Sequence, residues 1–186
     1  LKEYVEAAAA YEEFKKVHPT YEEGAYVQFQ IGMSYFNWMT TSDRDQTMTK
    51  KALASFEYLV ANYPPSLFTE KAKDKIGLCK KSLGEHEFQI GEFYYQHQKY
   101  QAAIARFEGL LEMFPKWLDE DRTLLYLGKC YLGLDQEDKA RTALEKLIKD
   151  DPGSPSAWEA RMILSKGPQI NKPSRQALEA KNAKTK

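Results

Sequence analysis

Residues 91–115, GEFYYQHQKYQAAIARFEGLLEMFP, combine small, bulky and helix-ending residues at fixed spacing. The five residues that set the spacing are Gly91, Tyr94, Ala103, Phe107 and Pro115. Counted from the glycine, the other four lie at offsets of 3, 12, 16 and 24. The small residues let two helices approach closely, the bulky residues fill the space beside that contact, and the proline ends the second helix. The stretch therefore predicts a pair of packed helices, A and B.

The same signature recurs along the chain. Gly128, Tyr131, Ala140, Leu144 and Pro152 repeat the offsets without change. Gly32, Tyr35, Ala52, Phe56 and Pro64 repeat them with eight extra residues before the alanine, and Ala7, Tyr11 and Pro19 match the second half. This spacing is typical of tetratricopeptide (TPR) repeats, in which neighbouring pairs stack because no single pair buries its apolar face. We expect an all-α, right-handed TPR superhelix of antiparallel helix pairs.

The repeats define the expected domain organisation. A TPR array covers 1–166, and a basic tail covers 167–186. The array comprises a partial repeat at 1–19, repeats near 20–64, 67–115 and 118–152, and a capping helix at 155–166. We expect helices at about 2–17, 20–39, 47–62, 67–98, 100–114, 118–132, 136–150 and 155–166.

One long helix is expected over 67–98. Pro64 lies 27 residues before the next signature glycine, against 13 for the other repeats, and 67–98 contains no proline. Gly77, Gly84 and Gly91 recur every seven residues and share one face of this helix. They form either a groove where neighbouring helices cross closely or a hinge.

Composition favours a stacked repeat core. The chain is 42% hydrophobic and 13% aromatic, and no apolar run approaches the roughly 20 residues of a membrane-spanning helix. Neither a signal peptide nor a complete first repeat is recognisable, so we expect a truncated start. Residues 166–186 carry six Lys/Arg and one Glu. We interpret them as a solvated end rather than a contact with nucleic acid or lipid, and no nucleic acid is expected as a partner.

The residue types that carry catalysis or metal binding form no recognisable motif. Cys79 and Cys130 lack CxxC spacing and are interpreted as buried free thiols. His18, His86 and His97 form no ligand cluster, and the catalytic motifs of common enzyme families are missing. We therefore expect no metal, no cofactor and no enzymatic activity.

Two surfaces are candidate binding sites. The eight-residue insertion, Thr40 to Thr47, is either a loop that contacts partners or a solvated loop in which Asp45 or Thr47 caps the next helix. On the preceding helix A, Tyr26, Phe29, Met33 and Phe36 share one face. This aromatic stripe either packs against another helix or cradles an extended apolar peptide.

Three segments are more specific than the repeat pattern. They are Ser42-Asp43-Arg44-Asp45 in the insertion, EFQIGEFYY at 87–95 and RFEGLLEMFP at 106–115. Together they resemble the BamD family (also called ComL or YfiO), the TPR lipoproteins of the bacterial outer-membrane β-barrel assembly machinery. The resemblance runs from about residue 1 to residue 165.

The resemblance implies a non-enzymatic scaffold at the periplasmic face of the outer membrane. In that family, the N-terminal repeats are associated with recognition of unfolded barrel proteins, and the C-terminal repeats with the POTRA domain of BamA nearest the barrel. An N-terminal lipidated cysteine, which this sequence does not contain, supplies the membrane anchor. Other lipoproteins of the machinery are further expected partners.

The resemblance also implies site residues. Arg106 matches the arginine of the family's R-x-E-G segment, which is linked to the BamA contact. Asp43, Arg44 and Asp45 are the expected contacts from the insertion. The alternative function is that of a general TPR adaptor for extended peptides.

Overall fold

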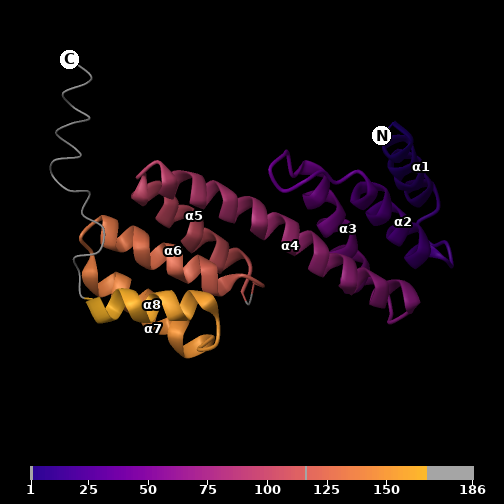
Figure 1. Ribbon diagram of the computed structural model, residues 1–186. Helices are drawn as coiled ribbons and strands as arrows, with labels where there is room; N and C mark the ends of the chain where they lie inside the picture. The colour runs from indigo at the N-terminus through magenta and orange to yellow at the C-terminus, as the bar shows by residue number, and fades with distance from the viewer. Residues whose placement is uncertain (1, 116, 167–186) are drawn as a thin grey trace, which may run out of the picture. The chain divides into compact units, whose positions relative to one another are not determined.

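The computed structural model describes residues 2–115 and 117–166. These residues form helices joined by turns and loops, without β-strands, so the predicted all-α, TPR-like fold is confirmed (Figure 1). The helices are α1 (Lys2–Val17), α2 (Gly24–Asn37), α3 (Thr47–Asn62), α4 (Leu67–Gln96), α5 (Tyr100–Met113), α6 (Glu120–Gly133), α7 (Glu137–Asp150) and α8 (Pro155–Lys166). The predicted basic tail lies outside the described residues.

The long helix α4 is confirmed, since it runs without a break through Gly77 and Gly84. It ends at Gln96, two residues before the predicted end, because Gln98 adopts a left-handed conformation with a φ of 57°. The amide of Lys99 then donates to the carbonyl of Tyr94 at 2.9 Å, which closes the helix end. Helix α2 also differs from the prediction, beginning at Gly24 rather than near residue 20.

The turn after α6 repeats this helix end. Asp135 has a φ of 56°, and the amide of Gln136 donates to the carbonyl of Tyr131 at 2.9 Å. Gln98 and Asp135 each lie seven residues after a signature glycine, Gly91 or Gly128. The A-to-B turn is therefore built in the same way in both repeats.

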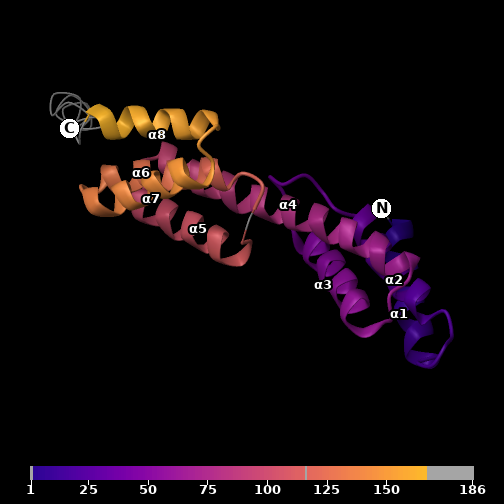
Figure 2. The ribbon, with the colours of Figure 1, turned by 90° about the horizontal axis from the view of Figure 1, so that it is seen from below.

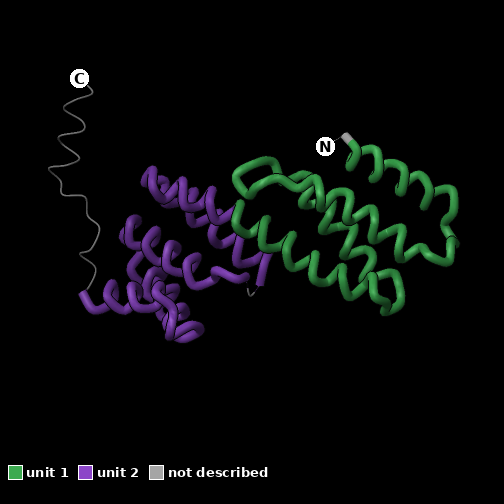
Figure 3. Tube along the Cα trace, turned by 45° about the vertical axis from the view of Figure 1, so that its right-hand side comes forward, with its two compact units in different colours: residues 1–86 green, residues 87–186 purple. Residues whose placement is uncertain are grey.

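The helices gather into two compact units, coloured separately in Figure 3. Unit 1 is Leu1–His86 and contains α1, α2, α3 and most of α4. Unit 2 is Glu87–Lys186 and contains the end of α4 with α5, α6, α7 and α8. Figure 2 shows the same helices from below. Each unit has its own buried core, so each is described separately.

The signature glycines make the predicted close contacts between helices A and B. A Cβ placed on Gly32 would lie 2.5 Å from Phe56 Cε1, and one on Gly91 would lie 2.5 Å from Phe107 Cε1. A Cβ on Gly128 would lie 2.6 Å from Leu144 Cδ2. In each repeat, the bulky residue of the signature occupies the space in front of the glycine, at offset 16 or, in the repeat with the insertion, at offset 24. Such distances leave no room for any larger residue.

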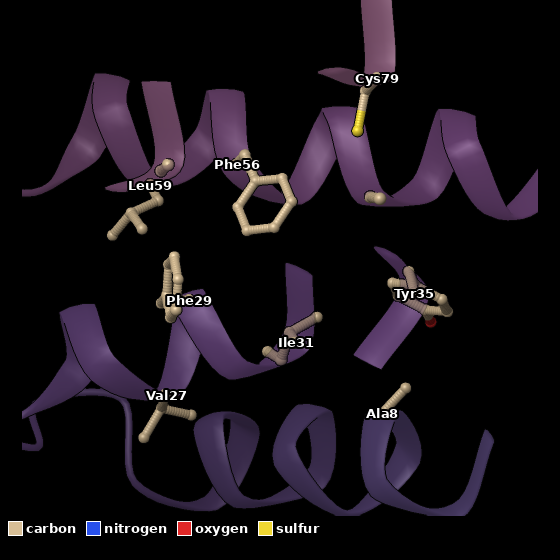
Figure 4. Packing of buried hydrophobic residues seen from close by; sticks show 10 residues of the cluster. Ala8, Val27, Phe29, Ile31, Tyr35, Phe56, Leu59 and Cys79 are labelled. Carbon is tan, nitrogen blue, oxygen red and sulfur yellow. The ribbon is translucent and has the colours of Figure 1, made fainter. Parts of the chain in front are cut away.

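The core of unit 1 illustrates this packing (Figure 4). Phe56 on α3 is fully buried and faces Phe29 on α2, with 5.7 Å between the ring centroids. Leu59 of α3 and Ile31 of α2 are buried in the same cluster. In unit 2, Ala103 and Phe107 are buried as predicted.

Tyr94 is partly buried and packs against the core of unit 2, as its place in the signature predicts. The prediction of a groove of glycines on α4 is wrong in part. Gly77 is exposed, and a Cβ there would meet nothing within 4 Å, so no neighbouring helix crosses closely at this glycine. By contrast, the interpretation of Cys79 and Cys130 as buried free thiols is confirmed. Burial raises the pKa of both thiols to about 12.

Candidate partner-binding site

The side chain of Gln46 is buried inside the insertion loop, residues 40–47, and holds the loop together through hydrogen bonds. Its side chain is only 4% exposed, and its amide nitrogen donates to the carbonyls of Thr41 and Arg44, both at 2.9 Å. Its side-chain oxygen accepts from the hydroxyls of Thr49 on α3 at 2.8 Å and Ser82 on α4 at 3.2 Å. Both donors and both lone pairs of the amide are used. The loop is therefore fixed to two helices of unit 1.

The sequence pattern alone does not single out Gln46. A glutamine in a polar loop is ordinarily exposed, and nothing in its neighbourhood along the chain distinguishes it from such a residue. Its burial depends on Ser82, which lies 36 residues away in the sequence.

The two aspartates of the loop are both engaged within it. Asp45 accepts hydrogen bonds from the Thr47 amide at 3.0 Å and the Thr47 hydroxyl at 3.1 Å, at the first residue of α3. Asp43 is bonded to the Thr41 hydroxyl and to its own backbone amide. Because these bonds favour the ionised carboxylates, the pKa of each aspartate lies below its ordinary value. The prediction that Asp45 or Thr47 is the N-cap of the next helix is wrong, because Gln46 holds that position and makes no capping bond with its side chain. Asp45, one residue earlier, instead binds the first residue of α3.

A histidine holds the other side of the loop. The Nδ1 of His86, on α4, donates to the carbonyl of Ser42. With Gln46 inside and His86 alongside, the backbone of the Ser-Asp-Arg-Asp segment is held at several points. The side chain of Arg44 is exposed at the surface of this loop.

Arg106 lies on α5 and is exposed, one residue before the buried Phe107. Its guanidinium donates to Glu87 of α4 at 2.9 Å, forming an ion pair within unit 2. The side chains of Arg106 and Glu87 are 44% and 19% exposed. A partner carboxylate could reach Arg106 only by sharing it with Glu87 or displacing Glu87.

The aromatic stripe lies on α2 beneath the first half of α4. The rings of Tyr26 and Phe29 lie 5.4 Å and 5.7 Å from that of Phe68. The ammonium of Lys75 lies 4.3 Å from the ring centre of Phe36. Phe29 is buried, while Tyr26, Met33 and Phe36 are partly buried in the same cluster. These contacts favour the packing alternative over the peptide cradle.

The equivalent face in unit 2 is covered in the same way. Phe88 of α4 is fully buried, with its ring 5.5 Å from that of Tyr126 and the Arg122 guanidinium 4.4 Å away. Both neighbours lie on α6, the next helix A. Positions that align with the stripe therefore pack between successive A helices.

Tyr26 also lines an apolar cavity of about 520 Å³ between α1 and α2. The other aromatic residues around it are Tyr11, Phe14 and Tyr21. Phe14 and Tyr21 are exposed, so the cavity is accessible in unit 1. Of the stripe residues, Tyr26 is the one among the lining residues of this cavity.

Residues 2–115 and 117–166 also bear on metal binding and on membrane insertion. Within these ranges, no three His, Cys, Asp or Glu side chains come together in a way that could hold a metal ion. None of the helices formed there is both long and apolar enough to cross a membrane.

The match to a known family extends over most of the chain. Residues 1–147 match the model of the YfiO family, described as outer membrane lipoprotein. The chain belongs to the YfiO family. The loop around Gln46, the Arg106–Glu87 pair and the aromatic stripe all lie within the part of the chain that matches the YfiO model.

Curated relatives of this chain are named outer membrane protein assembly factor BamD. The protein of Caulobacter vibrioides is 28% identical over 144 residues, covering 76% of this chain and 47% of the relative. That of Buchnera aphidicola is 29% identical over 138 residues, covering 70% and 56%. That of Rickettsia prowazekii is 27% identical over 152 residues, covering 82% and 61%. The chain spans about half the length of the curated relatives it matches.

Proposed function

We propose that this chain forms part of a non-enzymatic scaffold for outer membrane protein assembly. The observation that carries the proposal is the match of residues 1–147 to an outer membrane lipoprotein family whose curated members are named assembly factors. The stacked helix pairs support it, because repeat arrays present extended surfaces that bind other proteins. The proposed location is the periplasmic face of the outer membrane, with the longer protein held there by a lipid anchor.

The proposed partner is the POTRA region of BamA, together with other lipoproteins of the machinery and unfolded barrel proteins awaiting insertion. Arg106 is the candidate contact on unit 2, and the loop carrying Asp43, Arg44 and Asp45 is the candidate contact on unit 1. The exposure of Arg106 and its planar guanidinium support pairing with a carboxylate of the partner. Glu87 would hold the guanidinium in place until the partner binds.

A double-mutant binding cycle tests this contact. Arg106→Leu should weaken binding of the purified BamA POTRA region by about 2–5 kcal/mol, because it leaves the acidic partner residue unpaired. Combining Arg106→Leu with removal of that acidic residue should cost less than the sum of the two single changes. Arg141→Leu, at an exposed arginine of α7 in the same unit, is the matched control and should change binding by less than about 0.5 kcal/mol.

Two results would reject these assignments separately. Additive effects in the cycle would mean that Arg106 does not touch the acidic residue. A wild-type chain that fails to co-purify with BamA would reject the partner itself.

The cavity beside Tyr26 supports a second candidate function, that of an adaptor for extended peptides. Its lining of Tyr11, Phe14 and Tyr21 suits an aromatic or apolar side chain. An extended peptide ending in an aromatic residue should slow hydrogen exchange at residues 21–27. Unchanged exchange there would leave the stripe with a packing role alone.

A further inference from the structure

The three charged residues of the loop between α2 and α3 differ in the contacts that they make. The carboxylate of Asp45 receives both the amide and the hydroxyl of Thr47, and that of Asp43 receives the Thr41 hydroxyl. The hydrogen bonds of both carboxylates therefore stabilise the loop and the start of α3.

Arg44 stands apart from these internal bonds. Within residues 2–115 and 117–166, its carbonyl accepts from Gln46, but no hydrogen bond or ion pair engages its guanidinium. The side chain is exposed, and its positive charge helps to lower the pKa of the neighbouring Asp43. Arg106, by contrast, is already paired with Glu87.

The backbone that carries Arg44 is unusually well held for an exposed loop. Gln46 binds the Arg44 carbonyl from inside, and His86 binds the Ser42 carbonyl from α4. The Thr40 hydroxyl donates to the Asp45 carbonyl at 3.1 Å. Bonds on both sides of Arg44 fix its Cα position in advance, which lowers the ordering cost of a contact made by its side chain.

We propose that Arg44 binds a carboxylate of a protein partner, and that the loop holds Arg44 in position before the partner binds. Asp43, Asp45 and Gln46 stabilise the loop and do not contact the partner. The inference rests on the proposed scaffold function and divides the loop residues between two roles. A planar guanidinium pairs with one carboxylate through two parallel hydrogen bonds.

The charges beside Arg44 argue against a membrane surface as the partner. Asp43 and Asp45 flank the arginine, and their negative charges oppose approach to a sheet of anionic lipid headgroups. Lipid binding ordinarily uses clusters of basic residues, whereas this loop carries a single arginine between two acids.

The test measures two quantities for each variant of the chain. The first is hydrogen exchange of the free protein at residues 47–50, the start of α3, and the second is affinity for the purified BamA POTRA region. Arg44→Gln should leave exchange unchanged and raise the Kd about tenfold. Arg44→Lys should recover only part of that loss, because lysine keeps the charge without the planar fork.

Variants of the residues that stabilise the loop should change hydrogen exchange, and should change affinity only as a consequence. Asp45→Ala and Gln46→Leu should speed exchange in the free protein, and any loss of affinity should accompany that change. For Asp43→Asn, too, any rise in the Kd should be accompanied by faster exchange, because Asp43 stabilises the loop and does not make the contact. Arg141→Gln, an exposed arginine on α7, is the control for loss of one positive charge.

Each remaining outcome has a defined meaning. If Arg44→Gln binds like the wild type, or if an aspartate variant loses affinity with unchanged exchange, the assignment of roles is overturned. If the chain is retained on phosphatidylglycerol vesicles and this retention depends on Arg44, the proposal that Arg44 binds a carboxylate is rejected, and a lipid is its partner instead. A wild-type chain that does not bind the POTRA region overturns the proposed partner and this inference with it.

Discussion

Two signature tyrosines donate hydrogen bonds to glutamates that lie 23 residues earlier in the chain. Tyr35 on α2 bonds to Glu12 on α1 at 2.7 Å, and Tyr131 on α6 bonds to Glu108 on α5. Each bond ties a helix A to the preceding helix B. For Tyr94, the residue 23 positions earlier is Lys71, which belongs to the same helix, so the equivalent bond cannot form.

These bonds predict a delayed ionisation at high pH. Burial, followed by the bond to the glutamate, raises the pKa of Tyr35 and of Tyr131 to about 12 from an ordinary value of 10.0. Since the folded state holds these protons more tightly than the unfolded state, their stabilisation is complete below pH 10 and is lost as the pH rises through 12. Ultraviolet titration should show a late phase that shrinks in Tyr35→Phe and Tyr131→Phe. A single phase near the ordinary tyrosine pKa would contradict the prediction.

At the scale of one element, helix α4 contains two glycines with opposite surroundings. Gly77→Ala should stabilise the chain by up to about 1 kcal/mol, because alanine favours the helix and meets nothing within 4 Å. Gly91→Ala should destabilise it by about 1–3 kcal/mol, because the new Cβ would lie 2.5 Å from Phe107. The measurement is equilibrium unfolding in denaturant, with each variant serving as control for the other. Changes of the same sign would show that these packing assignments are wrong.

The sequence predicts most of these elements because the repeat spacing constrains contacts as well as helices. An offset of 16 residues between Gly91 and Phe107 is enough to place one against the other. The ends of the helices were harder to predict, because Gln98 adopts a left-handed conformation that is more often taken by glycine.

The candidate site was less predictable than the helices. Periodicity places Phe29 and Phe36 on one face of α2, but it does not say which helix covers that face. The cover is the first half of α4, which carries Phe68 and Lys75. The buried Gln46 likewise depends on a partner distant in the sequence, and local pattern contains no signal for such contacts.

Among residues 2–115 and 117–166, the buried clusters of unit 1 and unit 2 have no residue in common. Phe56 fills the centre of one core and Phe107 the centre of another, and both are fully buried against a signature glycine. In repeat proteins, stability is approximately a sum of each repeat and its contacts with its neighbours. A destabilising substitution in one core should therefore lower the stability of its own unit most.

This locality can be measured by hydrogen exchange in two matched variants. Phe56→Ala and Phe107→Ala should each cost about 3–5 kcal/mol, because each leaves a cavity that the surrounding helices cannot fill. Phe56→Ala should accelerate exchange in α2 and α3 more than in α6 and α7, and Phe107→Ala should do the reverse. Phe93→Ala, at a phenylalanine that is 55% exposed, is the control and should change exchange little in either unit. Equal acceleration throughout the chain in both core variants would instead mean that the two units unfold as a single cooperative structure.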